Sequence, residues 1–309
     1  MGSPVRCFAM TPDVSIVIPT IGKDERLRRT LDSIQAMTGP TFEVVVADQS
    51  GGENVKRIVS AYDGAHVRRV VDAGRGRARG IVCGASRACG KYLAITDDDV
   101  IVEPDWLSAA LNSFERHKPC DAVLGRISPF SEKPRADYLR PDQTEWPDEQ
   151  PLSTRTVWEG FGANQVFLRK AWDAVGGMDP RCGVGGRCPA ADDSEILYRM
   201  FMLGFKLWYD PSVRIWHDGW EPEQIRLPKL RKYQAGSMSV RIKCWAEVGG
   251  PALREIAAET ARLWAEGLYY LSRRRRGTAA AYFRKGWNYV SGVPLGISLA
   301  MEPRPRKVQ

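Results

Sequence analysis

The sequence lacks an uncharged apolar run of about 18 residues, the length that a helix needs to span a bilayer. Its N-terminal stretch, MGSPVRCFAMTPDV, also lacks the apolar core of a signal peptide. These absences argue against a membrane-spanning or exported protein. We therefore expect a cytoplasmic protein, with peripheral contact at the inner face of a membrane left open.

Cysteine is too sparse and too irregular to suggest a disulfide framework. The seven cysteines are spread from Cys7 to Cys244 without a regular spacing. An odd number in a chain without an export signal is typical of reduced thiols. We therefore expect free cysteines.

The basic residues lack interleaved aromatic side chains of the kind that stack on single-stranded nucleic acid. The formal net charge is nevertheless +8, with excess charge at residues 68–87 and in the C-terminal third. Such a charge favours an anionic partner. We expect no nucleic acid, which leaves nucleotides and phospholipid surfaces.

Short β-branched runs alternate with amphipathic segments over about the first hundred residues, which predicts an α/β fold with a mostly parallel, Rossmann-like sheet flanked by helices. Ligands bind at the carboxyl ends of the strands in such sheets. Asp48, Asp72 and the run Asp97, Asp98, Asp99 follow predicted strands directly. Strands are predicted at residues 14–18, 43–47, 67–71 and 92–96, and the first helix begins near Asp24, with Leu27, Leu31 and Ile34 on one face.

The pattern changes after the first 127 residues. Residues 128–158 are polar and rich in proline, which is typical of a lid or substrate loop. Further strands are predicted at residues 165–168 and 213–217, and a helix at residues 193–203. After residue 221 the chain is predicted to be mostly helical, with a basic tail.

Three consecutive aspartates after a buried strand indicate a metal site. Alternate residues of an extended chain point to the same side, so Asp97 and Asp99 can reach one ion while Asp98 faces away. Carboxylates suit Mg²⁺ or Mn²⁺. The alternative is a solvated turn in which the first acid caps the helix near Pro104.

Ordered motifs over residues 14–217 resemble glycosyltransferase family 2, the inverting nucleotide-sugar enzymes with the GT-A fold. The motifs are VSIVIPT at 14–20, EVVVADQS at 43–50, GRARG at 76–80, GKYLAITDDDVIVEPDWL at 90–107, GFGANQVFLRKAWDAVGG at 160–177, VGGMDP at 175–180 and ADDSEILYRMFMLGFKLWYDPSVRIWH at 191–217. The resemblance implies a metal-dependent enzyme that moves a sugar from a nucleoside diphosphate to an acceptor hydroxyl. The acceptor would be a glycan, a lipid-linked molecule or a small natural product.

The resemblance also implies roles for individual residues. Pro19, Thr20 and Asp48 would line the nucleoside pocket, and Arg79 would lie near the nucleotide. Asp97, Asp98 and Asp99 would form an Asp-x-Asp element at the nucleotide sugar, with Asp97 and Asp99 at the metal and Asp99 in direct contact. His217 falls where the family often has a histidine that reaches the metal or the diphosphate. A histidine that only packs within the core is the alternative.

The second acidic block contains the expected catalytic base. An inverting transfer needs a carboxylate that takes the proton of the acceptor hydroxyl. The family usually has Glu-Asp-x-Asp where this chain has residues 191–195, and its second acid is the base, which points to Asp193. Asp192 and Glu195 remain alternatives for the base. Asp192-x-x-Glu195 also fits a helix-capping box, which would give these acids a structural role.

Three other classes fit the sequence less well. Residues 74–80 imitate a dinucleotide-binding turn, but Arg79 stands where that turn needs glycine. A nucleotidyltransferase on a related fold would leave residues 175–217 unexplained. A catalytically inactive nucleotide-sugar-binding homologue would not need Asp97, Asp99 and Asp193.

The resemblance and the composition together predict four parts. Residues 1–13 form an N-terminal segment, and residues 14–127 form the nucleotide-sugar-binding half. Residues 128–220 form the acceptor-binding half with the base. Residues 221–309 form a C-terminal helical extension, whose mixture of basic, aromatic and apolar residues also fits peripheral contact with an anionic membrane.

Overall fold

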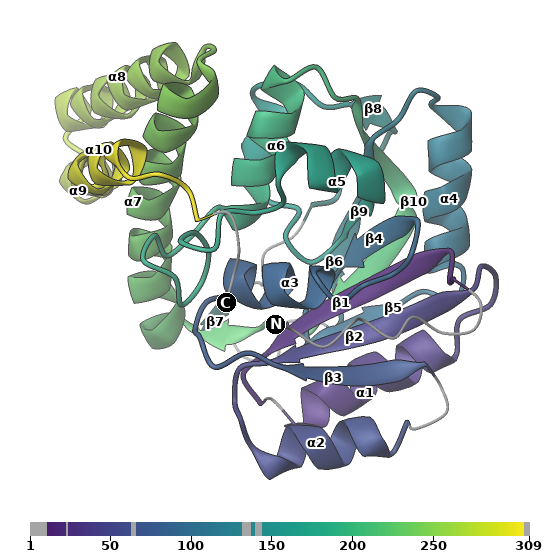
Figure 1. Cartoon of the computed structure of the whole chain (residues 1–309). Coiled ribbons are helices and arrows are strands. Elements are labelled where there is room, and N and C mark those ends of the chain that lie inside the picture. The colour runs from purple at the N-terminus through teal and green to yellow at the C-terminus, as the bar shows by residue number, and fades with distance from the viewer. Residues whose placement is uncertain (1–10, 23, 63–65, 132–136, 140–143, 306–309) are drawn as a thin grey trace.

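One mixed sheet organises the larger part of the protein (Figure 1). The computed structural model describes residues 11–22, 24–62, 66–131, 137–139 and 144–305. In these residues nine strands form a sheet in the order β3-β2-β1-β4-β9-β6-β10-β5, with β8 beside β10, and β7 pairs with β11 separately. The strands are β1 (Val14–Thr20), β2 (Phe42–Asp48), β3 (Val67–Val71), β4 (Tyr92–Ile95), β5 (Val100–Val102), β6 (Ala122–Pro129), β7 (Tyr138–Leu139), β8 (Gln150–Pro151), β9 (Gln165–Leu168), β10 (Leu207–His217) and β11 (Glu221–Pro222).

The first four strands are parallel neighbours, as their β-branched sequences predict. Helices α1 (Asp24–Gln35), α2 (Glu53–Ser60) and α4 (Trp106–Arg116) cover one face of the sheet, and Leu27, Leu31 and Ile34 of α1 are fully buried there. Helices α3 (Arg77–Ala85), α5 (Arg169–Val175) and α6 (Asp192–Met202) pack on the opposite face. The prediction of a mostly parallel sheet flanked by helices is confirmed.

Parallel and antiparallel pairs together complete the sheet and place the end of β10 beside the aspartate turn. β9 lies between β4 and β6 and runs antiparallel to both. β10 is parallel to β6 and antiparallel to β5. Because His217 pairs with Val100, the last residue of β10 lies next to Asp99.

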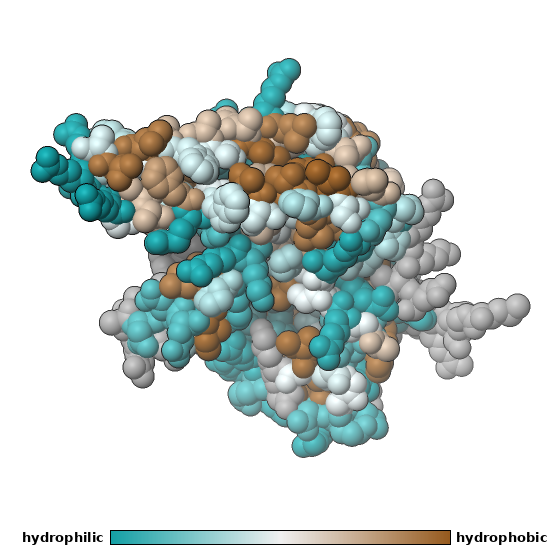
Figure 2. All heavy atoms as spheres, turned by 90° about the vertical axis from the view of Figure 1, so that its left-hand side faces the viewer, coloured by the Kyte–Doolittle hydropathy of each residue, from teal (hydrophilic) through white to brown (hydrophobic). Residues whose placement is uncertain are grey.

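Four helices follow the sheet and form a separate layer beside α6, as the sequence predicts for this region (Figure 1). They are α7 (Glu223–Val248), α8 (Ala252–Ser272), α9 (Arg276–Val290) and α10 (Val293–Met301), with a short 3₁₀ turn, η1 (Thr156–Trp158), earlier in the chain. Figure 2 shows hydrophobic residues gathered over the C-terminal layer. Within the described residues no helix has both the length and the apolar character needed to cross a membrane.

Two expectations from the sequence concern regions that are described only in part. Residues 1–10 of the predicted N-terminal segment lie outside the described residues, as do residues 132–136 and 140–143 of the predicted lid.

The expectation of free thiols is wrong at Cys89, which is disulfide-bonded. Cys83, Cys120, Cys182, Cys188 and Cys244 are free.

Candidate active site

The aspartate turn joins β4 to β5 at the carboxyl end of β4. Thr20, the last residue of β1, donates from Oγ1 to Oδ2 of Asp98 over 2.6 Å, and Asp98 is 5% exposed. This bond ties Asp98 to the neighbouring strand. The alternative of a solvated turn that caps the next helix is wrong, because Asp98 and Asp99 are buried and Asp105 is the N-cap of α4.

The other two aspartates meet the end of β10. Asp97, Asp99 and His217 each offer a ligand atom within 4.8 Å of the other two. Nε2 of His217 lies 3.2 Å from Oδ1 of Asp99, and Nη1 of Arg26 lies 3.4 Å from Oδ2 of Asp99. The structure thus brings together the three residues that the sequence singled out as metal ligands.

The chemistry of these three side chains fits Mg²⁺ or Mn²⁺. Two carboxylates supply hard oxygen atoms, and imidazole nitrogen is a further donor that transition metals accept. Mg²⁺ and Mn²⁺ sites that bind phosphates usually use only one or two protein carboxylates. The donor set therefore fits a divalent cation whose remaining ligands come from outside the protein.

A second acidic pair begins helix α6. The main-chain N–H of Phe161 donates to Oδ2 of Asp193 over 2.8 Å, which fixes the direction of this carboxylate. Burial and the neighbouring Asp192 carboxylate raise the pKa of Asp193, while the positive charge of Arg77 opposes that shift. Asp193 is only 7% exposed. A buried carboxylate with a raised pKa is a better proton acceptor than an ordinary aspartate.

Arg77 joins the two acidic groups. Its Nε donates to Oδ1 of Asp97 and its Nη1 to Oδ2 of Asp192, each over 2.7 Å. Its Nη2 donates to the main-chain oxygen of Gly162. Burial alone would lower the pKa of Arg77, but Asp97 and Asp192 raise it, so the guanidinium stays charged. The sequence indicated only that Arg77 belongs to the GRARG turn, and reasoning from the sequence missed this role.

Glu195 turns away from the site, so the predicted capping box does not form. Helix α6 begins at Asp192, and its N-cap residue Ala191 makes no side-chain cap hydrogen bond. Glu195 is fully buried, accepts from Arg199 over 2.7 Å and lies 2.6 Å from Nζ of Lys243. Burial raises the pKa of Glu195, but Arg199 and Lys243 outweigh it and hold the pKa well below its usual range.

The predicted nucleoside residues lie at the carboxyl ends of β1 and β2. Thr20 and Asp48 are register partners. Asp48 is fully buried and accepts from the main-chain N–H of Ser50 over 2.8 Å and from Nε of Arg69 over 2.7 Å. A Cβ on Gly80 would meet Cβ of Pro19 at 3.1 Å, so Pro19 lies against the start of α3.

Arg79 lies two residues beyond Arg77 in α3 and pairs with a different acid. Its Nε donates to Oδ1 of Asp72 over 3.0 Å, and Gln49 donates to the other oxygen of Asp72 over 2.8 Å. Burial would raise the pKa of Asp72, but these hydrogen bonds lower it. The structure therefore places Arg79 beside the strand-end loops and not beside the aspartate turn.

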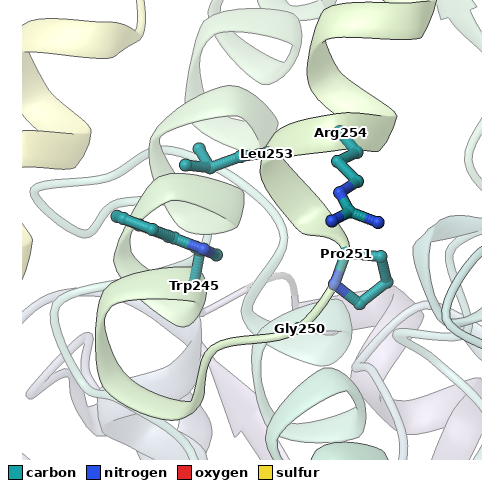
Figure 3. Close-up of a pocket in the computed structure, with 5 residues that line it drawn as sticks. All are labelled: Trp245, Gly250, Pro251, Leu253 and Arg254. Atoms are coloured by element: carbon teal, nitrogen blue, oxygen red, sulfur yellow. The ribbon is translucent and has the colours of Figure 1, made fainter.

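A cavity of about 490 Å³ lies away from these acids, at the turn between α7 and α8 (Figure 3). None of its lining residues belongs to the acidic groups described above. They are Trp245, Gly250, Pro251, Leu253 and Arg254. This cavity therefore has no direct part in chemistry at the aspartate turn.

Comparison with known proteins identifies the family of the chain. The model of a protein family described as glycosyl transferase family 2 matches residues 15–176, which is more than half of the chain. The chain belongs to glycosyl transferase family 2. It is therefore a glycosyltransferase, and the resemblance found in the sequence is confirmed.

Two curated relatives are glycosyltransferases whose names give different acceptors. A glucosyl-dolichyl phosphate glucuronosyltransferase of Haloferax volcanii is 25% identical over 215 residues, covering 66% of this chain and 68% of that protein. A validoxylamine A glucosyltransferase of Streptomyces hygroscopicus subsp. limoneus is 29% identical over 266 residues, covering 75% of this chain and 55% of that protein. The glycosyltransferase thus spans about two thirds of the first relative and about half of the second.

Solved structures show the fold. The mannosyltransferase PcManGT from Pyrobaculum calidifontis, in complex with GDP-Man and Mn²⁺, superposes with a TM-score of 0.58 at 17% identity, covering 93% of this chain and 90% of that chain. S. aureus TarS superposes with a TM-score of 0.57 at 13% identity, covering 90% of this chain and 55% of that chain. The glycosyltransferase therefore has the predicted GT-A fold.

Proposed function

We propose that the glycosyltransferase is an inverting, metal-dependent enzyme that takes its sugar from a nucleoside diphosphate donor. The observation that carries this proposal is the division of its acids into two groups. Asp97, Asp99 and His217 form one group whose ligand atoms lie within 4.8 Å of one another. Asp193 belongs to a second group on a different element, where Phe161 orients it. Two separate groups of acids suit a transfer in which one group holds a metal at the leaving diphosphate and the other takes the proton of the acceptor hydroxyl.

The donor would bind at the carboxyl ends of β1, β2 and β4. Pro19, Thr20 and Asp48 would line the nucleoside pocket, with Arg79 near the nucleotide. Asp98 would support the same pocket from behind, because its bond to Thr20 fixes both residues. The GDP-Man complex of PcManGT supports a nucleotide-sugar donor, since it has the same fold.

Asp97, Asp99 and His217 would hold Mg²⁺ or Mn²⁺. When bound, such a cation offsets the negative charge that grows on a departing diphosphate. Arg26 beside Asp99 and Arg77 beside Asp97 would add positive charge at the same edge of the sheet. The Mn²⁺ in the PcManGT complex supports this choice of cation.

Asp193 would take the proton from the acceptor hydroxyl as that oxygen attacks the anomeric carbon. Its raised pKa and its orientation by Phe161 support this role. Asp192 is engaged by Arg77, and Glu195 is enclosed by Arg199 and Lys243. The sequence leaves three acids open as the base. Among the contacts of the described residues, Asp193 is the one of the three whose carboxylate forms no ion pair.

The acceptor class stays broad in this proposal. A glycan, a lipid-linked molecule and a small natural product all carry a hydroxyl that Asp193 could deprotonate. The names of the two curated relatives include a dolichyl phosphate and validoxylamine A, which supports both lipid-linked and small-molecule acceptors. Contact with a membrane surface is a separate proposal, because it depends on the C-terminal helices.

An assay of nucleoside diphosphate release tests the proposed reaction. The full chain would be incubated with Mn²⁺ and a panel of nucleotide sugars, with and without acceptor extracts. We expect one donor to release its diphosphate faster when the right acceptor is present. Pyrophosphate formed from a nucleoside triphosphate and a sugar phosphate would instead identify a nucleotidyltransferase. Donor binding without turnover under every condition would identify an inactive homologue.

A further inference from the structure

The C-terminal helices carry large apolar side chains that remain exposed. On α8, Trp264, Leu268 and Leu271 are 43%, 60% and 47% exposed and follow the spacing of one helical stripe. On α9, Trp287 and Val290 are 66% and 38% exposed at a spacing of three residues. We call these five residues the hairpin face. Exposed apolar side chains that are grouped in this way mark an interaction surface.

The two stripes lie on the same side of the hairpin. Trp264 contacts Phe283 with ring centroids 5.6 Å apart, and Tyr270 stacks on Tyr282 at 5.3 Å, so α8 and α9 run antiparallel. Gly267 of α8 faces Phe283 of α9, and Gly286 of α9 faces Trp264 of α8, so each glycine marks the side of its helix that contacts the other helix. At about 100° per residue, the exposed stripe of each helix lies about 60° around the helix axis from that glycine, in the same rotational sense in both helices. Because the helices are antiparallel, the same rotation points both stripes to one side.

Positive charge gathers at the tip of the same hairpin. Arg273–Arg275 form the connection between α8 and α9, Arg276 begins α9, and all four arginines are exposed. The three acids of α8 already have partners in the described structure: Glu255 accepts from Thr154, Glu259 pairs with Arg241, and Glu266 pairs with Arg262. The tip therefore offers uncompensated positive charge beside an apolar surface.

We propose that the hairpin face docks on an anionic phospholipid bilayer. The indole rings of Trp264 and Trp287 suit the boundary between acyl chains and headgroups, and arginines attract anionic headgroups. A second copy of the chain would bring the same excess of positive charge to the contact, so charge complementarity favours the lipid surface. Figure 2 shows the apolar surface of this layer with hydrophilic residues at one end.

The docked layer would be tied to the active site by buried ion pairs. Lys243 of α7 is fully buried and lies 2.6 Å from Glu195 of α6, the helix that carries the proposed base in its first turn. Lys243 also lies 3.1 Å from Asp179 and 2.9 Å from Glu247. Docking through α8 and α9 would therefore hold the acidic site in a fixed orientation above the bilayer.

Co-sedimentation of the full chain with vesicles tests the proposal. Vesicles of phosphatidylcholine alone would be compared with vesicles of phosphatidylcholine and phosphatidylglycerol in equal parts. We expect binding to the anionic vesicles, little binding to the neutral ones, and weaker binding as salt rises. No binding to anionic vesicles at moderate salt would overturn the proposal, whatever sugar-transfer activity the protein shows.

Matched variants test the residues. The double variant Leu268→Ser and Trp287→Ser should bind anionic vesicles at least tenfold more weakly. The substitutions Arg275→Gln and Arg276→Gln should each lower the affinity for these vesicles about fivefold. The controls are Leu203→Ser, which removes a 57% exposed leucine at the end of α6, and Lys56→Gln with Arg57→Gln on α2.

Equal binding of anionic vesicles by the variants and the controls would overturn the proposal. Self-association of the wild type that is lost in the Leu268 and Trp287 variant, without vesicle binding, would assign the face to a second copy. Thermal melting confirms that each variant folds.

Discussion

The guanidinium of Arg77 donates from Nη1 to Oδ2 of Asp192 over 2.7 Å and so joins residues 115 positions apart in the chain. The same side chain donates from Nε to Asp97. One cation therefore lies between the acid at the proposed metal site and the acid beside the proposed base. The positive charge of Arg77 also acts on Asp193, because it opposes the rise in the pKa of that carboxyl group.

Substitution of Arg77 by glutamine should shift the pH dependence of transfer. The pKa of Asp193 is raised by burial and by Asp192, and removing the positive charge of Arg77 raises it further. A base works only when deprotonated, so the acidic limb of the profile of kcat/KM against pH should move to higher pH. Activity near neutral pH should fall as a result. Arg75→Gln removes an exposed arginine from the same turn and should leave the limb in place. An unshifted limb in Arg77→Gln would contradict the proposed coupling.

Gly183→Ala should disturb Asp192 directly. Gly183 has a φ of +91°, and an added Cβ would lie 2.7 Å from Cγ of Asp192. The carboxylate must move, which weakens its bond to Arg77, and we expect transfer to fall about tenfold or more, since small displacements at an active site are costly. Gly204→Ala is the matched control, because Gly204 has a φ of +89° but nothing within 4 Å of the added Cβ. Equal loss of transfer in both variants would show that backbone strain alone is responsible.

Lys243→Met should destabilise the protein while leaving the acidic site chemically intact. Lys243 is fully buried against Glu195 and Asp179, and its removal takes one positive charge from a buried network in which Arg199 and Arg181 are then left to compensate these carboxylates, at a cost of about 3–5 kcal/mol. Denaturant unfolding measures this loss of free energy. Lys229→Met is the control, because the pair of Lys229 with Glu221 is partly exposed. A free energy of unfolding within about 1 kcal/mol of the wild type would contradict the importance of this network.

The same network predicts how the wild type responds to acid. The folded-state pKa of Glu195 lies well below its usual range, because Arg199 and Lys243 outweigh burial. Stability from this group is therefore present above the ordinary glutamate pKa of about 4.3 and is lost as pH falls below it. Denaturant unfolding of the wild type at a series of acidic pH values should show this loss. Lys243→Met should show a weaker dependence on pH.

Chelation of the metal should abolish donor binding and turnover together. Asp99→Ala should do the same, because it removes a carboxylate that lies against His217 at the proposed metal site. Isothermal titration of Mn²⁺ and of the donor measures both effects. Asp105→Ala removes an exposed aspartate at the start of α4 and should bind Mn²⁺ and donor normally. Full turnover in the presence of excess chelator would exclude a metal requirement.

The sequence predicted those features whose cause is local. The runs that became β1, β2 and β4 are short and mostly apolar, and the resulting strands are almost entirely buried. Leu27, Leu31 and Ile34 share one face of α1 because helical spacing alone determines it. Asp97, Asp99 and His217 were singled out separately, and the register between β10 and β5 brings them together.

Features that depend on contacts across the fold could not be predicted in the same way. No local pattern places β9 antiparallel between β4 and β6. The spacing of Asp192 and Glu195 fits a capping box, but the attraction of Arg199 and Lys243 turns Glu195 into the core. Arg77 has partners 20 and 115 positions away, so neither ion pair leaves a signal in the turn that contains it.

The most direct test of the central claim compares donor binding with transfer in Asp193→Asn. The substitution keeps the shape of the side chain and removes only the proton acceptor. We predict normal binding of Mn²⁺ and of the nucleotide sugar, with transfer slowed by about 10²–10⁴-fold. Normal transfer by the Asp193→Asn variant would contradict the assignment of the base and move it to Asp192 or Glu195.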